Sequence, residues 1–389
     1  MDKLDKHKTI TFFGDFSLSG KFAHEFLTEN EINIWKNVRN IIGKESAIAI
    51  NIESPYTSES KGIPYKWANL KANPKISYVL DEISVGILGN NHIGDFGLEG
   101  VQETVGILKR KGIKYAGYGN NIQEAIEPSV IIIDDVKIGI ISLCCPTTNG
   151  QFFATHNRSG VAPLGLNLLK EAIAKAKLVC DLVIPYLHWG IELLHDPTPD
   201  QIRLAHYAIK CGADAVLGCH SHTIQSFELF DGKWIFYGLG NFLFAPDFGN
   251  QILADGQIVE HPVTNEKQNR ESLSVIFSIN KCNGNPTLAL DNITYWYSDD
   301  KLIPKPLKEA DLYFQLKESN WKLKQFNKYN SDFLTNEEEP ILLAKINNGI
   351  ISYYNLPQLI DISKTKIMKS IFRRIMNYIF NKTLNLMKR

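Results

Sequence analysis

Short apolar, β-branched runs alternate with longer amphipathic stretches from residue 8 to about residue 225. The runs have the length of buried strands, and the longer stretches repeat their apolar positions at helical spacing. This alternation predicts an α/β fold with a largely parallel, layered sheet. The expected strands are 9–13, 47–52, 84–88, 113–116, 129–134, 137–143, 181–187, 214–218, 224–229 and 234–237. The expected helices are 22–42, 73–80, 98–111, 164–178 and 199–211.

Three further segments extend this pattern. Asp134 and Asp135 stand between two of the runs and predict a tight hairpin turn. Two later runs, 272–280 and 286–297, are expected to add strands near the edge of the sheet. The stretch 245–271 is polar and rich in Gly, Asn, Asp and Gln, which predicts a long loop that is either a lid or disordered.

The pattern changes near residue 300. Segments 307–328 and 337–349 are expected to be helical, and Pro357 is expected to open a last helix. Residues 364–389 carry eight basic residues and no acidic one, with apolar residues at helical spacing between them. This pattern is typical of a basic amphipathic helix.

We therefore divide the chain into a main domain over 8–300 and a C-terminal helical extension over 301–389 that ends in a basic amphipathic tail. The apolar stripe of the tail has two readings. It either packs on the rest of the chain or makes a peripheral contact with a membrane or a synthase complex. At an anionic membrane, each exposed Lys or Arg would add about 1 kcal/mol of attraction.

Composition narrows the class of protein. The chain has 389 residues and is 44% hydrophobic, enough for one large domain plus an appendage. The 42 acidic and 42 basic residues cancel, so no global charge recruits nucleic acid. None of the 6 cysteines forms a C-x-x-C pair, which favours a reducing compartment. With no signal-peptide core and no membrane-spanning stretch, the chain is expected in the cytoplasm or on the inner face of the plasma membrane.

Polar residues of the kinds that bind metals follow five of the apolar runs. They are Asp15, Glu53, Asn91 with His92, His188, and His220 with His222. Because the carboxyl ends of parallel strands meet at one edge of a sheet, we expect these side chains to converge there. A series this rich in His, Asp, Glu and Asn predicts a metal site rather than a set of unrelated caps.

A dinuclear hydrolytic site needs a carboxylate that bridges two cations about 4 Å apart, which together activate a water. Glu53 is the candidate bridge. Each cation then takes further ligands from different strand ends: Asp15 and His222 for one, and Asn91, His188 and His220 for the other. Neutral imidazole suits Mn²⁺, Fe²⁺ or Zn²⁺, and carboxylates also suit Mg²⁺.

Three neighbouring residues complete the expected site. His92 follows the ligand Asn91 and is expected to face the substrate and protonate the leaving oxygen. Asp95 is expected to orient His92, because an outer carboxylate fixes the tautomer and direction of an imidazole. Glu192 is expected either to orient a ligand or to bind metal itself. Asn241, in a Gly-Asn-Phe sequence, is expected to serve a turn.

Several motifs, in this order and spacing, resemble the CapA family of capsule and poly-γ-glutamate synthesis proteins. They are Gly14-Asp15 with Gly20, Asn51-Ile52-Glu53-Ser54-Pro55, Asn90-Asn91-His92-x-x-Asp95-x-Gly97-x-x-Gly100, Gly117-x-Gly119-Asn120, His188-Trp189-Gly190-x-Glu192, Gly218-Cys219-His220-Ser221-His222 and Leu239-Gly240-Asn241-Phe242. The resemblance implies a calcineurin-type metallophosphoesterase fold, a four-layer α-β-β-α sandwich. It also implies a surface-polymer pathway.

The chain departs from the usual metallophosphoesterase pattern at two positions. Ser17 stands where a histidine is usual, and Glu53 stands where an aspartate is usual. The resemblance extends to these positions, since CapA relatives share them. The first cation is left short of a ligand, so it is either weakly held or completed by Glu192.

The sequence leads to one main hypothesis and two rivals. The main hypothesis is a metal-dependent hydrolase with two divalent ions that cleaves a phosphoester or phosphodiester in a phosphorylated glycan or another anionic polymer. The first rival uses the same activated water on an amide or ester of a surface polymer. The second is a non-catalytic accessory subunit of a polymer-synthesis complex, which the incomplete first cation site favours.

Overall fold

The structure is a computed structural model that carries all side chains. It describes residues 7–20, 34–64, 66, 68–148, 150, 152–245, 247–253, 257–263, 267–281, 284–299, 303–308, 345–347 and 350–352. The contacts within the chain group into two units, Met1–Pro340 and Ile341–Arg389. The site predicted from the sequence falls entirely within the first unit.

One sheet has eight strands, in the order β18-β17-β16-β1-β2-β3-β4, with β13 paired to the end of β1. Its strands are β1 (Thr9–Ser17), β2 (Ser46–Ile52), β3 (Val85–Ile87), β4 (Lys114–Ala116), β13 (Asn241–Phe244), β16 (Glu271–Asn280), β17 (Thr287–Ser298) and β18 (Pro304–Leu307). The strands β1 to β4 are parallel, and β16 joins β1 antiparallel. The two late runs therefore build one side of this sheet, as the sequence predicted.

The second sheet has six strands, in the order β11-β12-β10-β9-β7-β6. Its strands are β6 (Ser129–Ile133), β7 (Val136–Cys144), β9 (Leu182–His188), β10 (Ala215–Cys219), β11 (Phe227–Phe230) and β12 (Lys233–Phe236). The central strands β7, β9, β10 and β12 are parallel. The hairpins β6-β7 and β11-β12 close the two sides.

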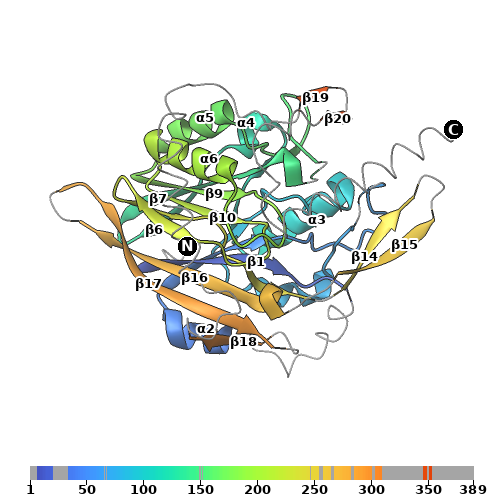
Figure 1. Ribbon diagram of the computed structural model, residues 1–389, viewed down its shortest axis with the longest axis horizontal. Coiled ribbons are helices and arrows are strands. Elements are labelled where there is room, and N and C mark those ends of the chain that lie inside the picture. Colours follow the sequence, from blue (N-terminus) through green and yellow to red (C-terminus); the bar gives the residue numbers. More distant parts are fainter. Residues whose placement is uncertain are drawn as a thin grey trace, which may run out of the picture. The chain divides into compact units, whose positions relative to one another are not determined.

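The two sheets pack face to face between two layers of helices (Figure 1). Helices α2 (Ile34–Ile42) and α3 (Gly97–Arg110) share a core with the outer face of the first sheet. Helices α5 (Leu166–Lys177) and α6 (Pro199–Lys210) share another with the outer face of the second sheet. This arrangement confirms the predicted four-layer α-β-β-α sandwich.

Alternation along the central strands explains the layers. In β2, Ala47 and Ala49 face the second sheet, whereas Ile48 and Ile50 face the helices. Both faces of such strands are buried, so their sequences are apolar throughout and do not alternate between apolar and polar residues. The Tyr186 hydroxyl donates a hydrogen bond across the sandwich to the Phe13 carbonyl at 2.6 Å, which ties the sheets together next to the site.

The predicted hairpin at Asp134 and Asp135 is confirmed. Ile133 pairs with Val136, so the turn has two residues. Both aspartates have positive φ, 49° and 64°. This is the conformation that a type I′ turn requires, and Asp tolerates it better than most residues do.

Several shorter elements were not predicted. They are β5 (Tyr118–Gly119), α4 (Ile122–Ala125), β8 (Gly160–Val161) and the 3₁₀ turns η2 (Pro146–Thr148) and η3 (Lys267–Arg270). The helix predicted over 73–80 is present as the 3₁₀ helix η1 (Pro74–Leu80). The prediction of an irregular loop over 245–271 is wrong. This stretch contains an antiparallel hairpin of β14 (Asp247–Ile252) and β15 (Ile258–Val263), followed by η3. Its polar composition fits a two-stranded hairpin without a large apolar face.

The boundary near residue 300 also needs correction. Pro304–Leu307 forms β18, which pairs with β17, so the sheet continues into the segment predicted as a helical extension. The helix predicted over 337–349 is wrong at Lys345–Asn347, which forms the strand β19 and pairs with β20 (Ile350–Ser352). Most of 307–328 and the tail 364–389 lie outside the described residues. Among the described helices, none has the length and apolar character needed to cross a membrane.

Candidate metal centre

The side chains predicted to bind metal meet at one end of both sheets. Asp15 lies near the end of β1 and Glu53 follows β2, in the first sheet. His188 is the last residue of β9 and His220 follows β10, in the second sheet. Parallel strands in both sheets thus deliver their carboxyl-terminal residues to the same place.

Four groups of these side chains have ligand atoms that all lie within 4.8 Å of one another. The groups are Asp15 with Glu53 and His222, Glu53 with His188 and His220, Glu192 with His220 and His222, and Asp15 with His188 and Cys219. Glu53 belongs to the first two of these groups, and each of those two corresponds to one predicted cation. The structure therefore brings together the carboxylates and imidazoles that the sequence singled out, and their role as ligands stays a prediction.

The first group is held by a set of short polar contacts. Asp15 accepts from the Asn51 side chain at 2.8 Å and from the His220 backbone N–H at 3.1 Å. His222 Nδ1 lies 3.3 Å from the second Asp15 oxygen, and its Nε2 lies 3.6 Å from Glu53 Oε1. Burial alone would raise the pKa of Asp15, but the hydrogen bond and charge of His222 outweigh it and lower that pKa.

Glu53 is the least satisfied group of the site. It is fully buried, and its Oε1 has no hydrogen-bond partner among the described residues. Burial raises its pKa well above the ordinary value, and the neighbouring Asp15 charge adds to the rise. A carboxylate in this position needs a positive charge beside it to ionise at neutral pH.

The second group contains two buried, neutral imidazoles. Burial and the other histidines lower the pKa of His188 well below its ordinary value. Burial likewise lowers the pKa of His220 to about 4. The Asn91 side-chain oxygen lies 2.8 Å from His188 Nε2, which places it beside the pair. Neutral imidazole is the form that binds a metal ion. An amide oxygen only accepts, so His188 Nε2 carries the proton here, and that proton would have to move to Nδ1 for Nε2 and the Asn91 oxygen to hold one ion.

The chain between β10 and β11 is strained where it presents its two histidines. His220 and His222 have positive φ, 92° and 53°, a region that non-glycine residues rarely adopt. Such residues cost of order 1–3 kcal/mol each and cluster at functional sites. The conformation turns both rings toward the same carboxylates, which is the strongest local sign that these residues serve a function.

His92 and Asp95 form the predicted pair at the edge of the site. His92 Nδ1 lies 2.7 Å from Asp95 Oδ2, so Nε2 is the nitrogen left for a substrate. Burial, and next the charge of Lys66, lower the pKa of His92. At neutral pH the ring is therefore mostly uncharged, which suits taking up a proton before donating one.

Asn241 corrects one expectation. It begins the strand β13 rather than serving a turn, and its side-chain oxygen lies 2.8 Å from His222 Nδ1. Its Nδ2 donates to the Asn269 carbonyl at 2.8 Å, which fixes which end of the amide faces His222. An amide oxygen only accepts, so Nδ1 carries a proton, and Nε2 is the nitrogen that faces Glu53.

We expect Asn241→Ala to weaken Mn²⁺ binding about 10- to 100-fold, because His222 loses the partner that orients its ring. Isothermal titration calorimetry of the metal-free protein measures this change. The exposed Asn292 on β17 provides the matched control, and Asn292→Ala should leave the affinity unchanged. Equal affinities for both variants would show that His222 needs no partner or is not a ligand.

Some residues of the site were not predicted from the sequence. Asn90 accepts from the backbone N–H groups of His92 and Ile93 at 3.1 and 2.8 Å, so it shapes the turn that presents His92. The tandem Asn90-Asn91 is the signal that could have shown this, because Asn stabilises such turns through its side chain. Lys66 is buried against Asp95, and nothing in its sequence surroundings indicates it.

The residues present fit the two divalent ions that the sequence predicts. Besides Glu53 Oε1, His220 Nδ1 is buried without a hydrogen-bond partner in the described part of the chain. Buried polar atoms are almost always satisfied, and bound cations would satisfy these two atoms of the ligand cluster. The mixed imidazole and carboxylate donors suit Mn²⁺, Fe²⁺ or Zn²⁺, and the carboxylate-rich group also suits Mg²⁺.

Ser17 and Glu192 are the two residues that could add a ligand to the group of Asp15, Glu53 and His222. Ser17 is buried and bonds to Ser19 at 3.3 Å, and it belongs to none of the ligand groups. It does not replace the histidine that is usual at this position. Glu192 is exposed as a residue, but one carboxylate oxygen lies within 4.8 Å of His220 and His222 nitrogens. Glu192 is therefore placed to supply the missing ligand.

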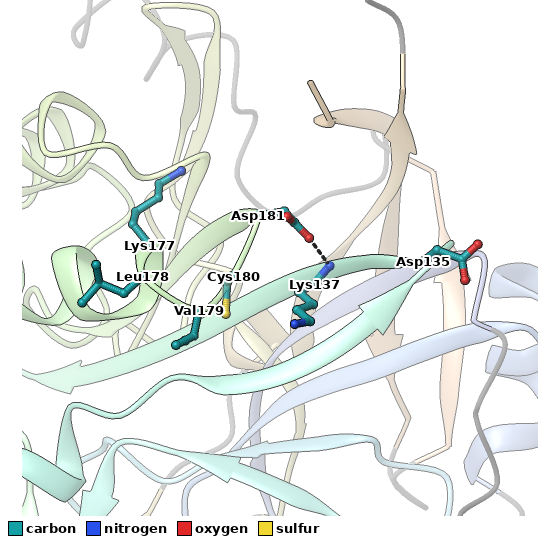
Figure 2. A pocket seen from close by; sticks show the side chains of 7 residues that line it. All are labelled: Asp135, Lys137, Lys177, Leu178, Val179, Cys180 and Asp181. Carbon is teal, nitrogen blue, oxygen red and sulfur yellow. Dashed lines mark hydrogen bonds between the residues drawn. The ribbon is translucent and has the colours of Figure 1, made fainter. Parts of the chain in front are cut away.

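A separate hollow lies at the other end of the second sheet (Figure 2). Its lining residues are Asp135, Lys137, Lys177, Leu178, Val179, Cys180 and Asp181. They come from the first residues of β7 with the turn before it, and from the end of α5 with the connection that leads into β9, whereas His188 stands at the end of β9. A strand rises about 3.3 Å per residue, so the length of β9 separates this hollow from the metal centre.

Residues 9–246 match the family of bacterial capsule synthesis proteins PGA_cap, and the chain belongs to this family. The chain is 30% identical over 262 residues to the PGA biosynthesis protein CapA of Bacillus subtilis, which covers 65% of this chain and 67% of the relative. It is 27% identical over 297 residues to the capsule biosynthesis protein CapA of Bacillus anthracis, with 73% and 70% covered. The match confirms the family that the motifs indicated.

Two other likenesses are more distant. The chain is 28% identical over 204 residues to a probable polyglutamine synthesis accessory protein of Mycobacterium tuberculosis, covering 49% of this chain and 54% of the relative. The calcineurin-like phosphoesterase YfkN of Bacillus subtilis superposes with a TM-score of 0.42 at 13% identity, covering 85% of this chain and 99% of that chain. The layered architecture therefore rests on the sheets and helices themselves, not on this superposition.

Proposed function

We propose that this chain is a metal-dependent hydrolase that cleaves a phosphoester or phosphodiester during the synthesis of capsule, exopolysaccharide or poly-γ-glutamate. One observation carries the proposal. Glu53, with a buried oxygen that lacks a hydrogen-bond partner among the described residues, lies in two groups of imidazoles and carboxylates at once. A single carboxylate shared by two ligand groups is the arrangement that two adjacent divalent ions require.

The proposed ligands divide between two ions. Asp15, Glu53 and His222 would hold the first, with Glu192 as the added ligand. The second would be held by Glu53, His188, His220 and Asn91. When bound, such ions polarise a phosphoryl oxygen and lower the pKa of a coordinated water.

The remaining residues prepare the site for a substrate. Asp95 holds His92 through Nδ1, so Nε2 can exchange a proton with the attacking or leaving oxygen. Asn51 and Asn90 form a buried amide chain that fixes Asp15, because Asn90 donates to Asn51 at 3.0 Å. The carboxylates are thereby fixed in position before a substrate arrives.

A phosphorylated glycan or another anionic polymer is the proposed substrate. The printed names of the Bacillus relatives refer to PGA biosynthesis and to capsule biosynthesis, which supports a polymer substrate. The carboxylates of Asp15, Glu53 and Glu192 would repel such a substrate, so binding depends on cations that offset their charge. Contact of the predicted C-terminal helix with a membrane or a synthase complex is part of the proposal and concerns residues outside the described ranges.

A non-catalytic accessory subunit is the second candidate. The mycobacterial relative is named as an accessory protein, and Ser17 leaves the first ion without the usual histidine. In this candidate the fold of the family serves to organise a polymer-synthesis complex. The amide or ester variant of the hydrolase uses the same residues and differs only in the electrophile.

The experiment that separates these functions combines metal analysis with a substrate comparison. Purified protein is analysed for Mn, Fe and Zn by mass spectrometry and assayed with Mn²⁺ on an aryl phosphate, an aryl ester and a γ-glutamyl amide. We expect about two ions per chain and preferential phosphate hydrolysis that is lost on chelation and restored by Mn²⁺. A folded protein that binds no metal and cleaves none of the three would favour the accessory role.

A further inference from the structure

Lys66 is a buried lysine with no part in the function proposed so far. It lies on the connection between β2 and η1 and is 1% exposed. Its ammonium group pairs with Asp95 Oδ1 and donates to the backbone carbonyl of Asn91. The same nitrogen lies 3.2 Å from His92 Nδ1. A buried ammonium is costly unless it is paired, so this placement needs a compensating role.

All three groups that Lys66 contacts belong to the short segment that carries the proposed chemistry. Asp95 orients His92 through its other oxygen, at 2.7 Å. The same Asp95 oxygen accepts from the Leu70 backbone N–H at 2.7 Å, and the Ile63 N–H donates to the Asp95 backbone carbonyl at 2.8 Å. The connection around Lys66 thus holds both the side chain and the backbone of Asp95 in place through hydrogen bonds.

Through its hydrogen bond to the Asn91 carbonyl, Lys66 also contacts a proposed metal ligand. The Asn91 side chain is fixed at both ends, with Oδ1 at 2.8 Å from His188 Nε2 and Nδ2 donating to the Thr148 carbonyl at 2.8 Å. Lys66 therefore contacts the backbone between a proposed metal ligand and a proposed proton-transfer residue. A compact ammonium group with several donors suits the two acceptors that Lys66 meets here, the Asn91 carbonyl and Asp95 Oδ1.

We propose that Lys66 is a positioning residue that holds the proposed metal ligand Asn91 and the proposed proton-transfer residue His92 in one fixed arrangement. The inference rests on the proposed function, because it gives that function a further part. Lys66 acts through Asn91, His92 and Asp95 and does not touch the substrate. Charge-assisted hydrogen bonds to a carboxylate and a carbonyl are strong enough to fix the segment.

Two variants and one control test this role. Lys66→Met removes the ammonium group and keeps the length of the side chain. Lys66→Met combined with Asp95→Asn also removes the negative charge whose Oδ1 would otherwise be buried without a partner, and so protects the fold. Asp95→Asn alone is measured beside it, because Asp95 itself orients His92. The exposed Lys61, five residues earlier on the same connection, gives the matched control Lys61→Met.

Three readouts are measured for each protein: thermal unfolding, Mn²⁺ affinity by calorimetry, and kcat and KM on an aryl phosphate. We expect both Lys66 variants to lose about 10- to 100-fold in Mn²⁺ affinity or kcat, the loss usual for an outer partner of a site. The double variant should regain thermal stability without regaining kcat. Lys61→Met should behave as the unchanged protein in every readout.

A fourth readout needs neither metal nor turnover. The ring resonances of His92 in ¹⁵N-histidine-labelled protein, assigned by comparison with His92→Ala, should be single and sharp in the unchanged protein. They should be broadened or multiple in Lys66→Met, and more so in the double variant than in Asp95→Asn alone. If the unchanged protein hydrolyses nothing, the hydrolase proposal fails, and these resonances still decide the role of Lys66.

Two results would overturn the inference. One is a double variant with sharp His92 resonances and with Mn²⁺ affinity and kcat within twofold of the unchanged protein, since Lys66 would then only neutralise Asp95. The other is a failure of both variants to fold, which would make Lys66 a general structural residue. Either result leaves the proposed roles of Glu53 and the histidines to their own tests.

Discussion

The variant Glu53→Gln should bind at most one Mn²⁺ per chain and lose hydrolysis of every substrate that the unchanged protein cleaves. Glu53 is the carboxylate shared by the two proposed ions, and an amide carries no charge to hold them. At a Mn²⁺ concentration 100 times Kd, binding should stabilise the unchanged protein by about 2.7 kcal/mol. Mass spectrometry and thermal unfolding with and without Mn²⁺ measure both losses.

The same substitution should have the opposite effect on the metal-free protein. Burial and the Asp15 charge raise the pKa of Glu53 well above its ordinary value of 4.5, so its ionisation destabilises the fold. Between 4.5 and the raised pKa, the folded state binds more protons than the unfolded state, and stability therefore falls as pH rises. Glu53→Gln removes this fall and should be more stable at neutral pH by about 1–3 kcal/mol, the cost of an unsatisfied buried group.

Glu99→Gln, at an exposed position in the first turn of α3, is the matched control for both measurements. It should bind metal and unfold as the unchanged protein does. Glu53→Gln that kept two ions, or that was less stable than the unchanged protein in the absence of metal, would contradict the placement of Glu53 at the centre of the site.

His92→Ala should lower hydrolysis by about 10²- to 10⁴-fold while both metal ions stay bound. His92 presents Nε2 to the substrate side, and it belongs to none of the groups of ligand atoms. Proton transfer is therefore lost without loss of the ions. Steady-state kinetics with Mn²⁺, together with the metal content of the same preparation, measure the two effects separately.

The exposed His156 gives a control of the same residue type, and His156→Ala should leave hydrolysis unchanged. Hydrolysis that survives in His92→Ala would remove His92 from its proposed role. Loss of metal together with activity would instead show that His92 supports the neighbouring ligand Asn91. The first outcome would exclude a proton-transfer role for His92, and the second would give it a role in supporting a metal ligand.

The ends of the strands explain why much of the site could be predicted. Runs such as 182–187 are apolar throughout because both faces of β9 are buried, and His188 follows directly as the strand reaches the sheet edge. The polar residue after such a run must then lie where other parallel strands also end. The same argument predicts that Asp15, Glu53 and His220 lie close to His188, and their ligand atoms do gather there.

Residues whose placement depends on the packing of distant segments could not be predicted in this way. Lys66 sits in an irregular connection, and its burial results from contact with Asp95, 29 residues later. Asn241 looked like a turn residue because Gly240 precedes it, yet Gly240 has φ of 72° and leads directly into β13. The hairpin of β14 and β15 was missed because the sequence of this stretch has no alternating apolar pattern to reveal its strands.

Crystals grown with Mn²⁺ and measured at an energy where manganese scatters anomalously provide the decisive measurement. We predict two anomalous peaks at the carboxyl ends of β1, β2, β9 and β10, both within ligand distance of Glu53. Asp15 and His222 should contact one peak, and His188, His220 and Asn91 the other. A well-ordered structure with saturating Mn²⁺ and no peak beside Glu53 would contradict the metal centre and the hydrolase built on it.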